Sequence, residues 1–281
     1  MFHIRKMSAE DFEFAVRLTD TMNWELGEAD FEFAMELDPD GCLVLLCKSE
    51  KVGVATAISY GKVGWLGNVI VSEKHRGKGG GSLLVRHATD YLTNKGVETI
   101  GLYAYLDRTP FYAEHGFQSE AKFKVLKGRG FSASDGVCAM EAGEDDMPQI
   151  VDLDRLYFGG SRTRLLEPVL LDPSSTCYVC KDDDQILGFA VAKKYGETSE
   201  IGPLVCERGC YDIAINLLKA GLRKAGNCEV SLCVPEKEPK ILDLLMRHGF
   251  REHLRLARMI RGTPVTNDHD YVYVAESLER G

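Results

Sequence analysis

The sequence predicts an α+β protein built from two consecutive copies of one fold. Three observations support this class. The chain contains a long internal repeat, each copy carries apolar runs separated by short polar turns, and the first copy has a glycine-rich basic segment between an apolar run and a helical pattern. With 281 residues and 44% hydrophobic content, the chain is long enough for two domains of ordinary size.

The internal repeat extends through most of the chain. Residues 37–39 (Leu-Asp-Pro) precede two apolar runs with a polar turn between them, and residues 171–173 (Leu-Asp-Pro) precede the same pattern in the second half. Further on, residues 115–117 (His-Gly-Phe) are matched by residues 248–250 (His-Gly-Phe). Agreement in both order and spacing indicates two copies of one fold.

The first copy opens with a short strand and two helices. Residues 4–6 form the predicted strand, and residues 9–21 have apolar positions spaced for one helix face, with Ser8 as the N-cap. A second helix is predicted over residues 30–37. It ends at residues 38–41 (Asp-Pro-Asp-Gly), which form a strong turn signal.

Three apolar runs follow, and they predict an antiparallel meander. The strands are expected over residues 43–48, 52–60 and 63–71, because only residues 49–51 and 61–62 separate them. Connections this short join antiparallel neighbours.

The remainder of the copy adds helices and closing strands. We expect a helix over residues 81–94, a strand over residues 99–104, a short helix around Phe111 and then the closing strands. Each copy is thus predicted to be a mixed, mostly antiparallel sheet flanked by helices.

The segment from Arg76 to Ser82 has the composition of a diphosphate-binding loop. Four glycines within it bring the backbone close to a ligand, and amide N–H groups ahead of a helix attract phosphate oxygens. A Walker loop does not fit, because the lysine precedes the last glycines, and a dinucleotide fingerprint fails because its third glycine position is Ser82. The pattern Arg-x-x-Gly-x-Gly is met by Arg76, Gly79 and Gly81.

This pattern, directly after residues 69–71, resembles the coenzyme A pyrophosphate loop of the GNAT (Gcn5-related) N-acetyltransferases. A second family segment, Phe/Leu-Tyr-x-x-x-Gly-Phe, is present at residues 111–117 in the expected order. The resemblance implies acetyl-CoA as the acyl donor, without a metal. The residues expected to bind the coenzyme are Val69, Ile70, Val71, Arg76, Gly77, Lys78, Gly79, Gly80, Gly81 and Ser82.

The second copy lacks these motifs. Residues 206–213 hold one glycine and two acids where the loop is expected, and Leu244-Leu245 replaces Phe111-Tyr112. The whole chain resembles the tandem family in which a degenerate GNAT-like domain follows a catalytic one. We therefore predict a catalytic domain over residues 1–134, a degenerate domain without a coenzyme loop over residues 135–281, and one active site per chain.

The resemblance also suggests catalytic residues. Tyr112 is the candidate general acid for the departing sulfur, since a thiol pKa near ~8.5 and a phenol pKa near ~10 would make the proton transfer nearly balanced. In the alternative, Tyr112 only packs or bonds the thiol. Candidates for the base are Glu25, on the loop between the first two helices, and Asn68, which could hold a water relay. Glu25 could equally be a solvated loop acid, and Asn68 a strand-end hydrogen-bonding residue.

Composition limits the partners. The net charge of −9 argues against nucleic acid and weakly favours a cationic acceptor. Charged residues make up 27% of the chain, and no apolar run reaches membrane-spanning length, so a cytoplasmic protein that does not bind membranes is expected. The nine cysteines are odd in number and scattered, which suits reduced thiols.

Two polar motifs of the second half allow a structural and a functional interpretation. Cys177 and Cys180, with Cys206 and Cys210, could be drawn as a zinc site, but residues three apart on a strand point to opposite faces. Residues 159–164 (Gly-Gly-Ser-Arg-Thr-Arg) could line a pocket facing the first domain or form a helix boundary with surface charge.

The function expected from the sequence is acetyl-CoA-dependent N-acetylation of a primary amine in a small molecule or a peptide. Two alternatives stay open. The chain could bind acetyl-CoA as a sensor or partner module without turnover, or it could use another acyl group or a hydroxyl acceptor. The sequence indicates neither the identity of the acceptor nor the oligomeric state.

Overall fold

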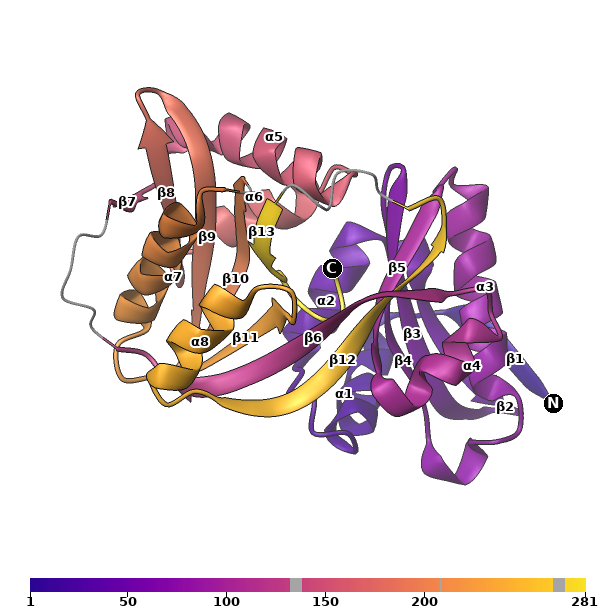
Figure 1. The fold of residues 1–281 in the computed structure, drawn as a ribbon. Coiled ribbons are helices and arrows are strands. Elements are labelled where there is room, and N and C mark those ends of the chain that lie inside the picture. Colours follow the sequence, from indigo (N-terminus) through magenta and orange to yellow (C-terminus); the bar gives the residue numbers. More distant parts are fainter. Residues whose placement is uncertain (132–137, 208, 265–270) are drawn as a thin grey trace.

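The two halves of the chain share one continuous mixed sheet of 13 strands with helices packed on it (Figure 1). The computed structural model describes residues 1–131, 138–207, 209–264 and 271–281. The predicted fold class, two tandem domains that each contain a mixed, mostly antiparallel sheet flanked by helices, is confirmed, and the two sheets are joined into one. Among the described residues, none of the helices combines the length and the apolarity that crossing a bilayer requires.

The first half contains the predicted elements in the predicted order. The strands β2, β3 and β4 pair antiparallel, so the predicted meander is confirmed. The elements are β1 (Phe2–Lys6), α1 (Phe12–Asp20), α2 (Glu28–Leu37), β2 (Cys42–Cys47), β3 (Glu50–Tyr60), β4 (Val63–Val71), α3 (Gly80–Asn94), β5 (Thr99–Tyr105), α4 (Thr109–Ala113) and β6 (Gln118–Arg129), with 3-10 turns at Ala9–Asp11, Pro39–Gly41, Glu73–His75 and Leu106–Arg108.

The second half repeats the plan of the first. A strand, two helices, a three-stranded antiparallel meander, a long helix and further strands follow one another as they do in the first half. The elements are β7 (Met140–Glu141), α5 (Met147–Phe158), α6 (Thr163–Leu171), β8 (Ser175–Asp182), β9 (Gln185–Tyr195), β10 (Thr198–Glu207), α7 (Tyr211–Ala225), β11 (Glu229–Pro235), α8 (Pro239–Arg247), β12 (Arg251–Gly262) and β13 (Tyr271–Val274), with a 3-10 turn at Glu144–Asp146.

The closing strands of the two halves are exchanged. Strand β12 of the second half pairs with β5 of the first, and β6 of the first half pairs with β11 of the second. Between them β6 and β12 pair with each other, and Figure 1 shows them crossing together from one half to the other. The predicted boundary at residue 134 lies outside the described residues. Each half therefore contributes a strand to the sheet of the other.

Helices cover both faces of the first half's sheet. Helix α3 packs against a cluster that includes Leu43 and Leu66, whereas α1 and α2 pack against Val44 and Ile70 on the other face. A further core joins the halves, where Trp65 of β4 lies among aromatic side chains of both. Burial of this apolar surface holds the two halves together.

Candidate active site

Strands β4 and β5 separate beside the predicted coenzyme loop. Their parallel pairing covers only Val63–Trp65 opposite Thr99–Gly101. Beyond Trp65, no strand in the described part of the chain pairs with this edge of β4. Within the segment Val69–Val71, the backbone amides that point away from β3 therefore lie on a strand edge that an extended ligand can join by hydrogen bonds.

A β-bulge marks the start of this open edge. Thr56 of β3 lies opposite Gly67 and Val54 opposite Ile70, so that Asn68 and Val69 together oppose one residue. Asn68 has a φ of 52°, and its Nδ2 donates to Thr56 Oγ1 at 3.4 Å. The side chain is nearly buried, at 9% exposure. The structure thus shows Asn68 holding the bulge through its own side chain.

The loop after β4 combines open backbone with positive charge. Arg76 Nε donates to the carbonyl of Val71 at 2.8 Å, which ties the loop to the strand end, and Lys78 Nζ donates to the carbonyl of Lys74 at 2.8 Å. Gly77 and Gly79 adopt φ values of +72° and +85°, which side chains rarely adopt, and have open space where a Cβ would lie. Helix α3 begins at Gly80, so its first amides face this space.

The last glycines of the loop have packing roles. A Cβ on Gly80 would lie 2.8 Å from Leu45 Cδ2, so this glycine lets α3 approach the sheet closely. A Cβ on Gly81 would lie 3.4 Å from Phe111, the residue before Tyr112. Phe111 of α4 therefore lies against the first turn of α3, next to the loop. Ser82, in that first turn, is half-buried.

Tyr112 lies on α4 and packs on the core beneath α3, in ring contact with Phe111 and Phe117. Burial raises the pKa of its phenol to about 12. The near balance that the sequence suggested is therefore wrong for this environment, because proton transfer to a thiolate with a pKa of about 8.5 is uphill. Such a phenol stays protonated and is suited to donate a hydrogen bond to a sulfur that gains charge.

Glu25 lies on the loop between α1 and α2, where its φ is 55°. Trp24 Nε1 donates to Tyr105 Oη at 2.8 Å, so this loop reaches across to the end of β5. The Glu25 carboxylate is 76% exposed and lies 3.8 Å from Lys127 Nζ on β6. A surface ion pair of this kind is the solvated role that the sequence allowed for Glu25.

In the second half, the corresponding separation between strands is filled. Strands β10 and β11 pair only through Thr198–Glu200 and Glu229–Ser231. Beyond that point β13 pairs antiparallel with Leu204–Glu207 of β10, on the edge equivalent to the open edge of β4. A strand of the chain itself therefore occupies the place where a coenzyme arm would bind. In the sequence, the run Tyr-Val-Tyr-Val at residues 271–274 is typical of such a strand.

Neither of the other polar motifs forms a metal site in the described structure. Cys177 and Cys180 belong to cores on opposite faces of the sheet, as their spacing predicts. No group of three or more potential metal ligands occurs among the described residues. Arg162 is not a surface charge but is buried between the halves, where it binds Asp154 with two hydrogen bonds, while Arg164 is exposed.

An open strand edge, a glycine loop at a helix N-terminus and a neighbouring phenol, repeated in degenerate form, define the tandem class of coenzyme-dependent acyltransferases. Family comparisons agree with this class. The "Acetyltransferase (GNAT) family" description matches residues 4–117, and the "Acetyltransferase (GNAT) domain" description matches residues 150–274. The chain belongs to the GNAT acetyltransferase family and carries two GNAT domains in tandem.

Similar proteins match the chain over most of its length. The holothin acyltransferase of Pseudoalteromonas sp. is 22% identical over 278 residues, which cover 98% of this chain and 92% of that protein. The N-acetyltransferase YitH of Bacillus subtilis, itself uncharacterised, is 22% identical over 78% of each chain. Among solved structures, a proposed acetyltransferase from Pyrococcus horikoshii has a TM-score of 0.81 at 23% identity and covers 100% of this chain and 96% of its own. A tandem GNAT protein of the clavulanic acid biosynthesis pathway has a TM-score of 0.64 at 13% identity and covers 94% and 99%.

Proposed function

We propose that this protein is an acetyl-CoA-dependent N-acetyltransferase that acts on a primary amine, with its one active site in the first half. The observation that carries the proposal is the open edge of β4 directly beside the loop at the N-terminus of α3. The loop amides, Arg76 and Lys78 bind the diphosphate. The pantetheine arm pairs with residues 69–71, which brings the thioester to the bulge at Asn68.

The chemistry follows from this placement. A backbone amide at the bulge donates to the thioester carbonyl as that oxygen gains negative charge in the tetrahedral intermediate. Tyr112 donates a hydrogen bond to the sulfur as the C–S bond breaks. The name of the holothin acyltransferase supports acyl transfer as the reaction.

The test of this function is a turnover assay with acetyl-CoA and a panel of amines: amino acids, polyamines, aminoglycosides and peptides with free N-termini. We expect coenzyme A release that depends on one class of amine, with the acetylated amine identified by mass spectrometry. Tight acetyl-CoA binding without any acetylated product would instead support a binding module. An ester product would contradict the proposed amine acceptor. Turnover only with longer acyl thioesters would contradict acetyl-CoA as the donor.

The variant Tyr112→Phe tests the hydrogen bond to sulfur. A hydrogen bond to a charged group contributes about 1.5–3 kcal/mol, so kcat should fall roughly 10- to 150-fold. Coenzyme affinity should stay the same, and the wild-type pH profile should show no ionisation of Tyr112 below pH 10, because its pKa is about 12. Tyr195→Phe, at an exposed tyrosine of the second half, is the control. Equal kcat for Tyr112→Phe and wild type would remove the phenol from the mechanism.

A further inference from the structure

The segment from Ala275 to Gly281 connects the two equivalent bulges of the repeat. It leaves β13 at the second half's bulge, where a Cβ on Gly202 would lie 2.0 Å from the carbonyl oxygen of Ala275. Four residues later it crosses the first half's bulge, where a Cβ on Gly67 would lie 2.2 Å from the carbonyl oxygen of Glu279. Both crossings require glycine. The segment thus reaches β4 one residue before Asn68.

The segment lies on the face of β4 that does not carry α3. Leu66 packs with α3, so its neighbours Trp65 and Gly67 point the other way, toward the segment. Trp65 Nε1 donates to the carbonyl of Leu278 at 3.3 Å. The diphosphate loop leads into α3 on the opposite face, so the segment approaches the thioester position from the side left to the acceptor.

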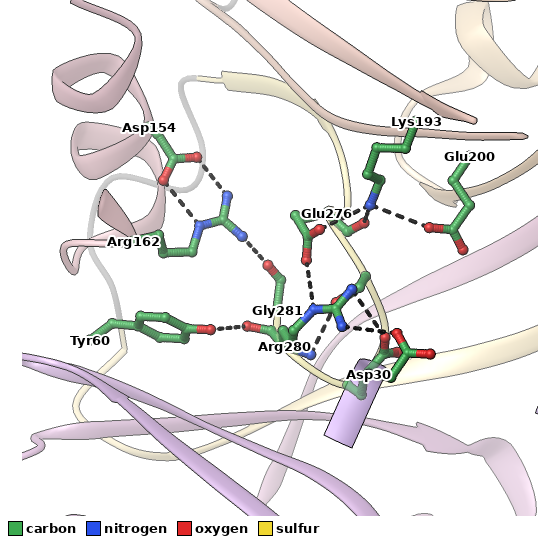
Figure 2. A network of polar contacts seen from close by, with 11 residues as sticks. Asp30, Tyr60, Asp154, Arg162, Lys193, Glu200, Glu276, Arg280 and Gly281 are labelled. Carbon is green, nitrogen blue, oxygen red and sulfur yellow. Dashed lines mark hydrogen bonds and ion pairs between the residues drawn. The ribbon is translucent and has the colours of Figure 1, made fainter. Parts of the chain in front are cut away.

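Buried charges hold the segment in place (Figure 2). Lys193 Nζ lies 2.9 Å from Glu276 Oε1, and both side chains are almost completely buried. Arg280 is buried beside Asp30 of α2, with 3.4 Å between Nη1 and Oδ1. At the far end, Tyr60 Oη donates to the carbonyl of Arg280 at 2.9 Å, and Arg162 donates to the carbonyl of Gly281. These contacts therefore hold residues 275–281 in place along this face of β4.

The segment and its ion partners together carry an excess of negative charge. Its ion network contains the two cations Lys193 and Arg280 and four carboxylates, so its formal charge is 2 − 4 = −2. The four carboxylates belong to Asp30, Glu200, Glu276 and Glu279.

Of the two carboxylates on the segment, only that of Glu279 is in contact with solvent. Its side chain is 18% exposed, whereas that of Glu276 is 0% exposed and is paired with Lys193. The cation next to Glu279 is Arg280, at 3.5 Å, and Arg280 also forms ion pairs with Asp30 and Glu276. Burial, together with the charges of Glu200, Glu276 and Asp30, raises the pKa of Glu279 despite Arg280.

We propose that Glu279, delivered by the second half, binds the ammonium group of the acceptor at the active site of the first half and takes its proton. The proposal rests on the function proposed above. It gives the second half a role, because β13 and the network of Lys193 place this carboxylate. It also restricts the acceptors to amines that arrive as cations.

The proton balance of the step is complete. The ammonium gives one proton to Glu279, and the free amine then attacks the thioester carbonyl carbon, forming the C–N bond. The C–S bond breaks with its electron pair on sulfur, and the second surplus proton of the nitrogen passes to the thiolate, to which Tyr112 donates a hydrogen bond. The products are the amide and coenzyme A, and Glu279 releases its proton to solvent.

The test compares Glu279→Gln, Glu279→Asp and the control Glu32→Gln, an exposed acid on α2. With acetyl-CoA and the amine of the panel that reacts fastest, Glu279→Gln should lower kcat/KM about 100-fold or more at pH 7, because general-base catalysis contributes roughly 10²–10⁴. Its remaining activity should rise tenfold per pH unit into the alkaline range, since it needs an amine that is already neutral. The aspartate variant should restore part of the rate, and coenzyme affinity should be equal in all variants.

A stability measurement separates this role from a structural one. A carboxyl pKa that is raised in the folded state means that stability falls as pH rises from the unfolded value of about 4.5 through the folded pKa. Glu279→Gln removes that loss, so its urea midpoint at pH 7 should equal or exceed the wild-type midpoint. A lower midpoint, or wild-type kcat/KM and pH profile in Glu279→Gln, would overturn the proposal for Glu279 alone. Absence of turnover of every amine by the wild type would overturn the proposed function as well.

Discussion

Gly79→Glu is expected to reduce the affinity for acetyl-CoA at least about 100-fold. The new carboxylate would lie in the open space between Arg76 and the first turn of α3, where the diphosphate is proposed to bind. Bringing like charges together costs several kcal/mol, and every 1.4 kcal/mol is a factor of ten. Isothermal titration calorimetry should show one site per chain in the wild type and no measurable binding in the variant. The double variant Gly79→Glu/Gly81→Glu should likewise show no measurable binding.

The matched control is Gly209→Glu in the second half. Gly209 occupies the corresponding loop, has a similar φ of +97° and likewise has open space at the Cβ position. Both substitutions therefore introduce a comparable backbone strain, about 1–2 kcal/mol for a left-handed residue. Only Gly79→Glu should affect coenzyme binding. If Gly209→Glu weakened binding to the same degree, or if Gly79→Glu left it intact, the assignment of the loop would be wrong.

The largest loss of stability is expected for Arg162→Met. Arg162 and Asp154 both belong to the second half. Their side chains are 1% and 0% exposed and form an ion pair through two hydrogen bonds, with a closest distance of 2.6 Å. Removing the arginine leaves the Asp154 charge buried without a partner. Breaking such a pair costs about 3–5 kcal/mol of the free energy of unfolding. Urea denaturation at pH 7 should show the loss as a lower midpoint with an unchanged slope.

A double-mutant cycle controls this experiment. Adding Asp154→Asn to Arg162→Met removes the stranded charge and should recover a substantial part of the lost stability. The control Arg223→Met, at an exposed position of α7, should change the free energy of unfolding by no more than about 0.5 kcal/mol. Additive losses in the double variant would contradict the coupling between Asp154 and Arg162.

Local sequence patterns were sufficient for the elements of each half. The predicted strand over residues 63–71 coincides with β4, and the predicted helix over residues 81–94 differs from α3 by one residue. Both patterns depend on neighbours within a few positions, so a single sequence contains them. The glycine loop could also be predicted from the sequence. Gly77 and Gly79 adopt positive φ values, which glycine permits more readily than other residues.

The pairing of the closing strands was not predictable in this way. β6 and β12 are both 12-residue strands, and either could close either half. The choice depends on contacts between residues more than a hundred positions apart. The pKa of Tyr112 also depended on tertiary structure, since burial on the core beneath α3 raises it. The same holds for Arg162, whose charge suggests a surface position until Asp154 is placed beside it.

The sequence by itself determined that the chain is a tandem protein and predicted one coenzyme loop, because repeats, glycines and apolar periodicity are local properties of the chain. Only the tertiary structure decided how the two halves cooperate. In that structure β13 pairs with the edge of β10 that corresponds to the open edge of β4, and Glu279 lies across the bulge at Asn68. That arrangement depends on burial and on a charge network between residues far apart in the chain, and neither produces a periodic pattern in the sequence.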